Sequence, residues 1–332
     1  MTGGSDVLQA SYAVCRRVAR GSGSSFYPAM LLLPPAKRRA MEALYAFLRH
    51  TDDLADSPLP LPVSQARLHA WRQAVSAALG PPAGWPHPAA PAVASGVPAD
   101  FGAARLLESE EAGIGKHASQ ASAGDAILPA VADTVQRYAI PPAYLWAVLD
   151  GVAMDLEHRG FETFEELAEY CRLVASAVGR ACLCIWGVHR DEALSLADHC
   201  GVAFQVTNIL RDVGEDAARG RAYLPRADLA ACGYSIEALW RREHNRGLDR
   251  VVERLAERAR AEYGLGAALF DLLDRDAQRV FGLMFSVYRH LLEEVVRCRR
   301  DLLVRRIRLG RWRKLALVTR WTLLAPRKLA LL

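Results

Sequence analysis

Helical periodicity runs through most of this chain, and no stretch of it is convincing as a strand–turn–strand unit. From Ala36 to Asp56, for example, apolar residues recur at the spacing of one helix face. Although 332 residues could form two average domains, this pattern favours a single large all-α domain. Because 52% of the residues are hydrophobic, such a domain has ample material for a core and for a deep internal cavity.

Pro, Ser and Thr residues at helix-capping and helix-breaking positions predict where individual helices begin and end. Pro34-Pro35 suits a helix start, and the Pro-rich stretch 58–62 ends that helix. Residues 80–127 are rich in Ala, Gly, Pro and Ser, and we expect a mobile insertion there. The other helices are expected at residues 66–79, from 142, from 163 (Thr163 and Glu166 as a capping box) through 178, at 191–212, from 236 and in two or three segments after 248.

The lengths of the apolar runs and the pattern of cysteines indicate the cellular compartment of the protein. No apolar run reaches the roughly 18 to 20 residues that a membrane-spanning helix needs, and residues 1–10 lack the features of a signal peptide. The seven cysteines include no CxxC pair, and their number is odd. We therefore expect a cytoplasmic protein whose thiols are reduced and mostly buried.

The carboxy-terminal segment is strongly basic. Between Arg297 and Lys328 there are twelve Arg or Lys residues and one acid, a net charge of +11 that leaves −6 for the rest of the chain. Trp and Leu interleave with these charges, which fits an interfacial helix on anionic lipid better than it fits nucleic-acid binding. We expect residues 311–332 to form a basic amphipathic tail in peripheral contact with the inner face of the membrane. A solvated helix packed on the domain is the alternative.

Two acidic motifs carry the chemistry. Asp52 and Asp56 lie four residues apart, and Asn208, Asp212 and Asp216 repeat that spacing in a later helix. Residues four apart project from one face of a helix, so each motif makes an acidic face. Asp is rare on buried faces unless it is paired or binds a metal.

Magnesium explains this arrangement. Mg²⁺ prefers oxygen ligands and is typically held by one or two carboxylates together with substrate phosphates. Two facing acidic pairs could hold several Mg²⁺ ions that neutralise a diphosphate leaving group. For one motif alone, the alternative is a solvated helix end whose acids pair with neighbouring arginines. Two motifs in one apolar chain favour the metal site.

Short segments in a fixed order accompany the two motifs. They are Ser24–Tyr27, Leu31–Pro34, Lys37–Ala40, Ala43–Phe47, Arg49–Asp56, Asp150–Leu156, Tyr170–Cys171, Val174–Ala175, Val178–Gly179, Gln205–Asp216 and Gly220–Pro225. Together they resemble the squalene/phytoene synthase family over about residues 8–310, apart from the predicted insertion. The resemblance implies an isoprenoid-synthase domain over residues 1–310, a single helical bundle around a central apolar cavity.

The resemblance also implies roles for individual residues. Tyr45 and Tyr170 match the family's active-site tyrosines, near the carbocation and the departing proton, although core aromatics at helical spacing are the alternative. The implied Mg²⁺ ligands are Asp52, Asp56, Asp212 and Asp216, with Asn208 close to the second pair. The implied diphosphate contacts are Arg49, Gln205, Arg211, Tyr288 and one of Arg305 or Arg306, where the local spacing differs by one residue. The implied pocket residues are Ser25, Phe26, Val174 and Phe204.

The implied reaction is the head-to-head (1′-1) condensation of two prenyl diphosphates. Residues 21–27 and 154–159 look most like bacterial enzymes that make presqualene diphosphate, from two farnesyl diphosphates, on the route to squalene. A phytoene synthase that uses geranylgeranyl diphosphate is the close alternative. A non-catalytic helical assembly factor is an alternative of another class, and the intact aspartates argue against it.

Departures from the family pattern bear on pocket shape and substrate length. Ser22-Gly23 precedes the early Ser pair, before which some relatives have a His, and Arg180 follows Val178-Gly179 where an apolar or acidic residue is more usual. Reduction of presqualene diphosphate to squalene would use NADPH, but no dinucleotide-binding fingerprint is visible in the sequence.

Overall fold

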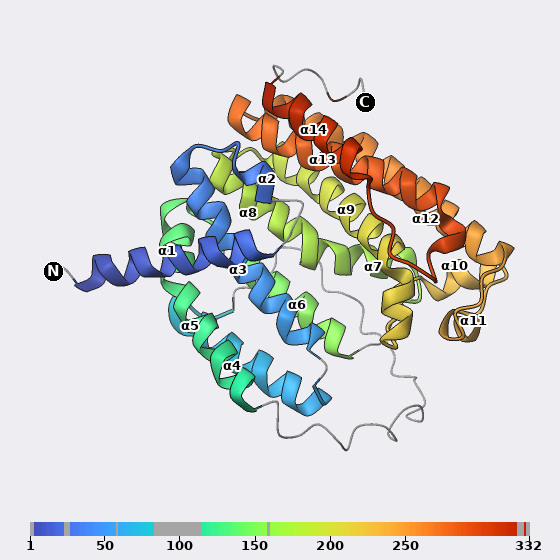
Figure 1. Cartoon of the computed structure of the whole chain (residues 1–332), viewed down its shortest axis with the longest axis horizontal. Helices are drawn as coiled ribbons and strands as arrows, with labels where there is room; N and C mark the ends of the chain where they lie inside the picture. The colour runs from blue at the N-terminus through green and yellow to red at the C-terminus, as the bar shows by residue number, and fades with distance from the viewer. Residues whose placement is uncertain are drawn as a thin grey trace.

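The structure is a computed structural model that describes residues 3–22, 27–57, 59–82, 114–157, 160–323 and 329. Within these ranges the chain is mostly helical and contains no strand (Figure 1). This confirms the predicted all-α class.

The first part of the chain supplies helices that pack on one another at one side of the bundle. They are α1 (Gly3–Gly21), α2 (Tyr27–Met30), α3 (Pro35–Asp56), α4 (Leu61–Leu79), α5 (Ile114–Arg137) and α6 (Pro142–Glu157). Helix α1 packs on α3 and α5, and α4 packs on α5 and α6. Pro35, Pro62 and Pro142 all lie in the first turn of a helix, where the missing N–H has no intrahelical partner to lose.

The second part of the chain surrounds the long helix α9, which runs through the middle of the bundle (Figure 1). Helix α9 packs against α8 and η1 and also against α12 and α13, so it links the two sides of the molecule. The elements are α7 (Phe164–Cys171), η1 (Arg172–Ser176), α8 (Ala177–Trp186), α9 (Asp191–Ala218), α10 (Arg226–Ala231), α11 (Ile236–Trp240), α12 (Arg246–Gly266), η2 (Ala267–Leu272), α13 (Arg275–Arg297), η3 (Arg299–Asp301) and α14 (Arg311–Leu323).

The helix predicted from Thr163 is interrupted by a π-helical turn, η1. Thr163 caps it as predicted, because its side chain accepts a hydrogen bond from the backbone N–H of Glu166. At η1 the backbone N–H of Ala177 instead bonds to the carbonyl of Arg172, five residues back. There Ser176 packs so closely on α9 that a methyl group at Gly201 would overlap it. Such turns are frequent at functional sites.

Several helices differ from the sequence prediction. Helices α1, α2 and α10 had no predicted counterpart. Helix α5 begins at Ile114, inside the predicted insertion, with Ile127 buried in the core. Pro129 interrupts the hydrogen bonding within α5. The side chain of Ser11 fills this gap, accepting from the N–H of Ala130 and donating to the carbonyl of Ala126. Residues 83–113 of the predicted insertion lie outside the described residues.

Helix α14 begins at Arg311, where the sequence predicts the basic tail to begin, and it packs on α13. Trp321 is buried, and its indole N–H donates to the hydroxyl of Ser286 at 3.1 Å. A methyl group at Gly282 would overlap the Trp321 ring, so this glycine is what lets α14 approach. Part of the tail is therefore a packed helix, the alternative that the sequence left open.

Two further expectations concern thiols and membrane spans. All seven cysteines are free thiols and six are buried, as expected. Among the helices of the described ranges, none combines the length and apolar character that crossing a bilayer requires.

Candidate active site

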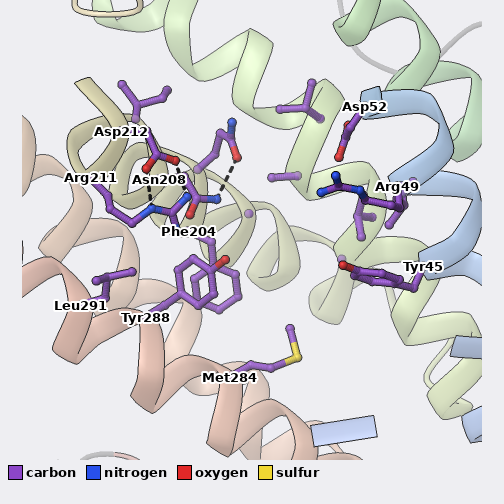
Figure 2. A pocket seen from close by; sticks show the side chains of 18 of the residues that line it. Tyr45, Arg49, Asp52, Phe204, Asn208, Arg211, Asp212, Met284, Tyr288 and Leu291 are labelled. Atoms are coloured by element: carbon purple, nitrogen blue, oxygen red, sulfur yellow. Dashed lines mark hydrogen bonds and ion pairs between the residues drawn. The ribbon is translucent and has the colours of Figure 1, made fainter. Parts of the chain in front are cut away.

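A cavity of about 940 Å³ lies between α3, α6, α8, α9 and α13, as predicted for the centre of the bundle. Its wall divides by chemistry. The last turns of α3 and the carboxy-terminal half of α9 contribute charged side chains, including Asp52 and Asp212. The opposite ends of these helices contribute apolar residues such as Met41 and Ala197. In Figure 2, Arg49 and Asp52 lie on one side of the pocket and Asn208, Arg211 and Asp212 on the other.

On the α3 side, Asp52 and Asp56 both line the cavity, one helical turn apart. Asp52 opens onto the cavity, but the surrounding protein removes part of its bulk hydration. This desolvation raises the pKa of the Asp52 carboxyl to about 7, and the nearby Asp155 and Asp56 add to the shift. The Asp52 carboxyl therefore keeps its proton to a higher pH than an ordinary aspartate.

On the α9 side, Gln205, Asn208, Asp212 and Asp216 line the same cavity. Partial burial raises the pKa of Asp216 to about 7, and the negative charge of Asp212 contributes second. The side-chain oxygen of Gln205 accepts a hydrogen bond from the Asn208 amide at 3.3 Å. The structure thus brings the two predicted acidic faces to one cavity.

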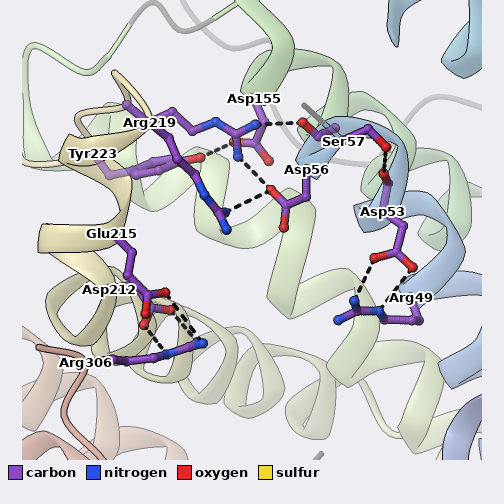
Figure 3. Close-up of polar contacts among 12 residues, drawn as sticks. Arg49, Asp53, Asp56, Ser57, Asp155, Asp212, Glu215, Arg219, Tyr223 and Arg306 are labelled. Atoms are coloured by element: carbon purple, nitrogen blue, oxygen red, sulfur yellow. Dashed lines mark hydrogen bonds and ion pairs between the residues drawn. The ribbon is translucent and has the colours of Figure 1, made fainter. Parts of the chain in front are cut away.

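Arginines neutralise both acidic faces (Figure 3). Asp212 pairs with Arg211, whose Nε lies 2.7 Å from Oδ1, and with Arg306, whose Nε lies 2.8 Å from the same oxygen. Asp56 pairs with Arg221 at 2.8 Å and with Arg219 at 3.6 Å. These pairs resemble the solvated-acid alternative in part, but the arginines line the cavity together with the acids.

The structure separates the two candidate arginines near the carboxy terminus. Arg306 lines the cavity and bonds to Asp212, whereas Arg305 pairs with Asp301 at 2.6 Å on the surface and is not part of the cavity wall. Arg49 lines the cavity and pairs with Asp53 at 2.8 Å.

Three functional candidates escaped the sequence analysis as individual residues: Asp155, Arg221 and Tyr223. The Asp155 carboxylate accepts hydrogen bonds from the hydroxyls of Tyr170 at 3.1 Å and Tyr223 at 2.8 Å. Burial raises the pKa of Asp155 to about 6, although both hydroxyls oppose the shift. The sequence pointed to these three residues only through the segments that contain them, Asp150–Leu156 and Gly220–Pro225.

The remaining predicted residues are aromatic or apolar. Tyr45, Val174 and Phe204 line the cavity. Tyr288 also lines it, and its ring centroid lies 4.8 Å from that of Phe204 (Figure 2). Burial raises the pKa of Tyr288, while the charge of Arg211 opposes the shift. Ser25 and Phe26 lie outside the described residues.

The polar end of the cavity offers oxygen atoms that could hold Mg²⁺ together with a bound phosphate group. The side-chain oxygen of Asn208 is buried and has no hydrogen-bond partner among the described residues, and an amide oxygen is a ligand that Mg²⁺ accepts. Within the described part of the chain, no three His, Cys, Asp or Glu side chains cluster tightly enough to enclose a metal alone. A site that uses one or two carboxylates together with substrate phosphates fits both observations.

Comparison with known proteins identifies the class that this fold and site define. The family model described as squalene/phytoene synthase matches residues 19–313. The chain therefore belongs to the squalene/phytoene synthase family, whose reaction joins two prenyl diphosphates head to head.

Relatives of this chain are named for different activities within the family. The phytoene synthase of Mycobacterium tuberculosis is 30% identical over 292 residues, which cover 86% of this chain and 82% of that protein. The presqualene diphosphate synthase of Sinorhizobium fredii is 30% identical over 275 residues, covering 82% and 83%. The crystal structure of squalene synthase HpnC from Alicyclobacillus acidocaldarius superposes with a TM-score of 0.69 at 26% identity, covering 87% of this chain and 94% of that one.

Proposed function

We propose that this protein condenses two farnesyl diphosphates head to head to presqualene diphosphate, the precursor of squalene. One observation carries the proposal: two acidic helix faces and several arginines meet at one end of a cavity whose other end is apolar. This division matches a prenyl diphosphate, which has a charged head and a hydrocarbon tail. The similarity to the Sinorhizobium fredii presqualene diphosphate synthase supports the choice of substrate.

A phytoene synthase activity on geranylgeranyl diphosphate is the second candidate. The similarity to the Mycobacterium tuberculosis phytoene synthase favours it at the same identity of 30%. A non-catalytic assembly role is disfavoured, because Asp52, Asp56, Asp212 and Asp216 are all present and line one cavity.

We propose that Asp52 and Asp56 bind Mg²⁺ from α3, and that Asn208, Asp212 and Asp216 bind it from α9. Bound Mg²⁺ would neutralise the diphosphate and so make it a better leaving group. Arg49, Arg211 and Arg306, which now pair with Asp53 and Asp212, would exchange these carboxylates for diphosphate oxygens. Gln205 and Tyr288, beside Asn208 and Arg211, complete the diphosphate-binding set.

The carbon chemistry takes place where the charged end of the cavity meets the apolar one. Loss of diphosphate leaves an allylic cation, the double bond of the second substrate attacks it, and loss of a proton closes a cyclopropane. Apolar walls that include Val174 and Phe204 exclude the water that would otherwise capture the cation. The second diphosphate remains attached to the product.

Tyr170 has the environment of a residue that steers a cation. Burial raises the pKa of the Tyr170 hydroxyl well above its ordinary value, and the charge of Asp155 raises it further. The hydroxyl therefore stays protonated, and its bond to Asp155 fixes the orientation of the ring. Tyr45 adds a second ring to the cavity wall. Aromatic faces attract cations. Because the protonated Tyr170 hydroxyl is not available as a base, we assign the departing proton to the released diphosphate, the alternative to Tyr170 itself.

We also propose that α14 contacts an anionic membrane surface, since both substrate and product are lipids. Trp312 is 74% exposed and Leu315 is 54% exposed on this helix. The adjacent Arg308 and Lys314 line the cavity, so the exposed apolar residues flank its rim. Apolar side chains among basic ones suit the headgroup region of anionic lipid.

The proposal is tested by incubating purified protein and Mg²⁺ with farnesyl or geranylgeranyl diphosphate, with and without NADPH, and identifying the products by mass spectrometry. We expect presqualene diphosphate from farnesyl diphosphate, and no product when EDTA replaces Mg²⁺. Squalene in the NADPH reaction alone would show that this chain also carries out the reduction. Release of only farnesol or geranylgeraniol would refute coupling.

A further inference from the structure

We propose that Trp186, backed by Phe281, closes the apolar end of the cavity and sets the longest prenyl tail that the protein accepts. The inference rests on the proposed function and adds a residue that determines specificity. Trp186 lies at the end of α8, its side chain lines the cavity, and it is only 3% exposed. Phe281 of α13 also lines the cavity, with its ring edge-on to Trp186 at a centroid distance of 6.5 Å.

Two helices place Trp186 far from the diphosphate end. The ammonium group of Lys37 contacts both the carbonyl of Trp186 and the carboxylate of Asp276, so the first turns of α3 and α13 meet at Trp186. Along α3, Lys37 precedes Asp52 by 15 residues, which is about 22 Å of helix. Along α13, Asp276 precedes Tyr288 by 12 residues, or about 18 Å.

Apolar residues of the cavity wall include Met30, Cys182, Leu269 and Val280 as well as Phe281. They come from α2, α8, η2 and α13, and both α2 and η2 pack on α13, the helix that carries Phe281. A hydrocarbon tail whose diphosphate lies at Asp52 or Asp212 and which follows α3 through the cavity would meet Trp186 last.

The backbone of Trp186 is anchored at the point where α8 ends. Lys37 donates to its carbonyl at 3.0 Å and to Asp276 at 2.9 Å. The next residue, Gly187, ends α8 in the left-handed region at a φ of 87°, and its N–H bonds back to the carbonyl of Cys184. The indole N–H of Trp186 has no hydrogen-bond partner among the described residues, so the side chain contributes its bulk alone.

The test compares Trp186→Leu with a matched control, Trp146→Leu. Trp146 is 2% exposed, and its indole N–H is likewise buried without a partner, but it is not part of the cavity wall. Each protein receives prenyl diphosphates of 15, 20 and 25 carbons in competition, and the ratio of kcat/KM for the longer to the shorter substrate is measured. We expect this ratio to rise about tenfold or more in Trp186→Leu and to stay unchanged in Trp146→Leu.

Binding of the same diphosphates by calorimetry separates this inference from the proposed function. If the wild-type protein couples no substrate, the proposed function fails, while tighter binding of longer tails to Trp186→Leu would still support the chain-length limit. An unchanged preference in a folded Trp186→Leu protein overturns the limit. Trp186→Phe, a smaller change, decides the question if the leucine variant does not fold, and it should shift the preference in the same direction.

Discussion

At the scale of single residues, the charged end of the cavity is a set of carboxylates that contact arginines. Asp56 and Asp212 each contact two arginines, while Asp52 and Asp216 have a raised pKa. Like charges this close oppose ionisation unless a cation compensates them. We propose that metal and diphosphate displace these protons and arginines.

Replacing a single carboxylate tests this exchange. We expect Asp52→Asn and Asp212→Asn each to lower Mg²⁺-dependent turnover about a hundredfold or more, because each removes a charge aimed at the leaving group. Circular dichroism and thermal melting should show an intact fold. The matched control is Asp301→Asn, which removes a surface carboxylate paired with Arg305. Full activity in the Asp52 and Asp212 variants would contradict the assigned mechanism.

Tyr170→Phe tests the tyrosine. We expect kcat to fall about tenfold with little change in KM, because the hydroxyl that orients the ring toward the cation is lost. Tyr223→Phe is the matched control, since Tyr223 donates to the same Asp155 carboxylate. An equal loss in both variants would assign the effect to Asp155, and wild-type turnover in Tyr170→Phe would remove that tyrosine from the mechanism.

The raised carboxyl pKa values predict how stability depends on pH. The pKa values of Asp52, Asp155 and Asp216 in the folded protein lie above the ordinary value of 3.8, so the folded protein binds these protons more tightly than the unfolded chain does. The resulting stabilisation of the fold is fully present below about pH 4 and is lost as the pH rises through 6 and 7. In EDTA, Asp52→Asn should therefore melt at a higher temperature than wild type at pH 8 and at nearly the same temperature at pH 4. Mg²⁺ with inorganic diphosphate should stabilise the wild-type protein more at pH 8 than at pH 6. A difference in melting temperature between variant and wild type that does not depend on pH would count against these shifts.

At the scale of helices, the sequence predicted α3 and α9 well because their signals are local. Paired prolines mark the start of α3, and the four-residue spacing of Asp52 and Asp56 fixes one face of it. Helices α1 and α5 were missed or misplaced because their support is tertiary, as in the contact of Ser11 with the proline-interrupted turn of α5. The π turn at η1 likewise depends on the packing of Ser176 against Gly201, which no local pattern reveals.

Helix α14 gives a prediction at the same scale. Removing it whole would also remove the buried Trp321, so point variants are the cleaner test. We expect Trp312→Ser/Leu315→Ser to weaken binding to anionic vesicles, measured by sedimentation at low and high salt. Trp240→Ser/Leu265→Ser is the matched control, with the same residue types exposed on α11 and α12. Equal sedimentation of both variants and wild type would reject the membrane contact.

At the scale of the whole molecule, the site exists only because segments far apart in sequence meet at one cavity. The sequence contains Asp155, Tyr170 and Tyr223 in separate motifs, and the hydrogen bonds that join them follow from the fold. The same holds for the two neighbouring arginines, because Arg306 contacts Asp212 of α9 whereas Arg305 contacts Asp301, and the sequence alone does not separate them. Motif spacing could therefore predict the acidic faces, but it could not predict their partners.

The central claim is that both acidic faces bind metal around diphosphates whose tails run toward Trp186. The most direct test is a crystal structure with Mn²⁺ and a farnesyl thiodiphosphate, a slowly reacting analogue, with the metal located by its anomalous scattering. We predict anomalous peaks beside Asp52 and Asp56 and beside Asn208, Asp212 and Asp216, and prenyl tails that end at Trp186 and Phe281. Metal bound elsewhere, or tails directed away from the cavity, would contradict the account.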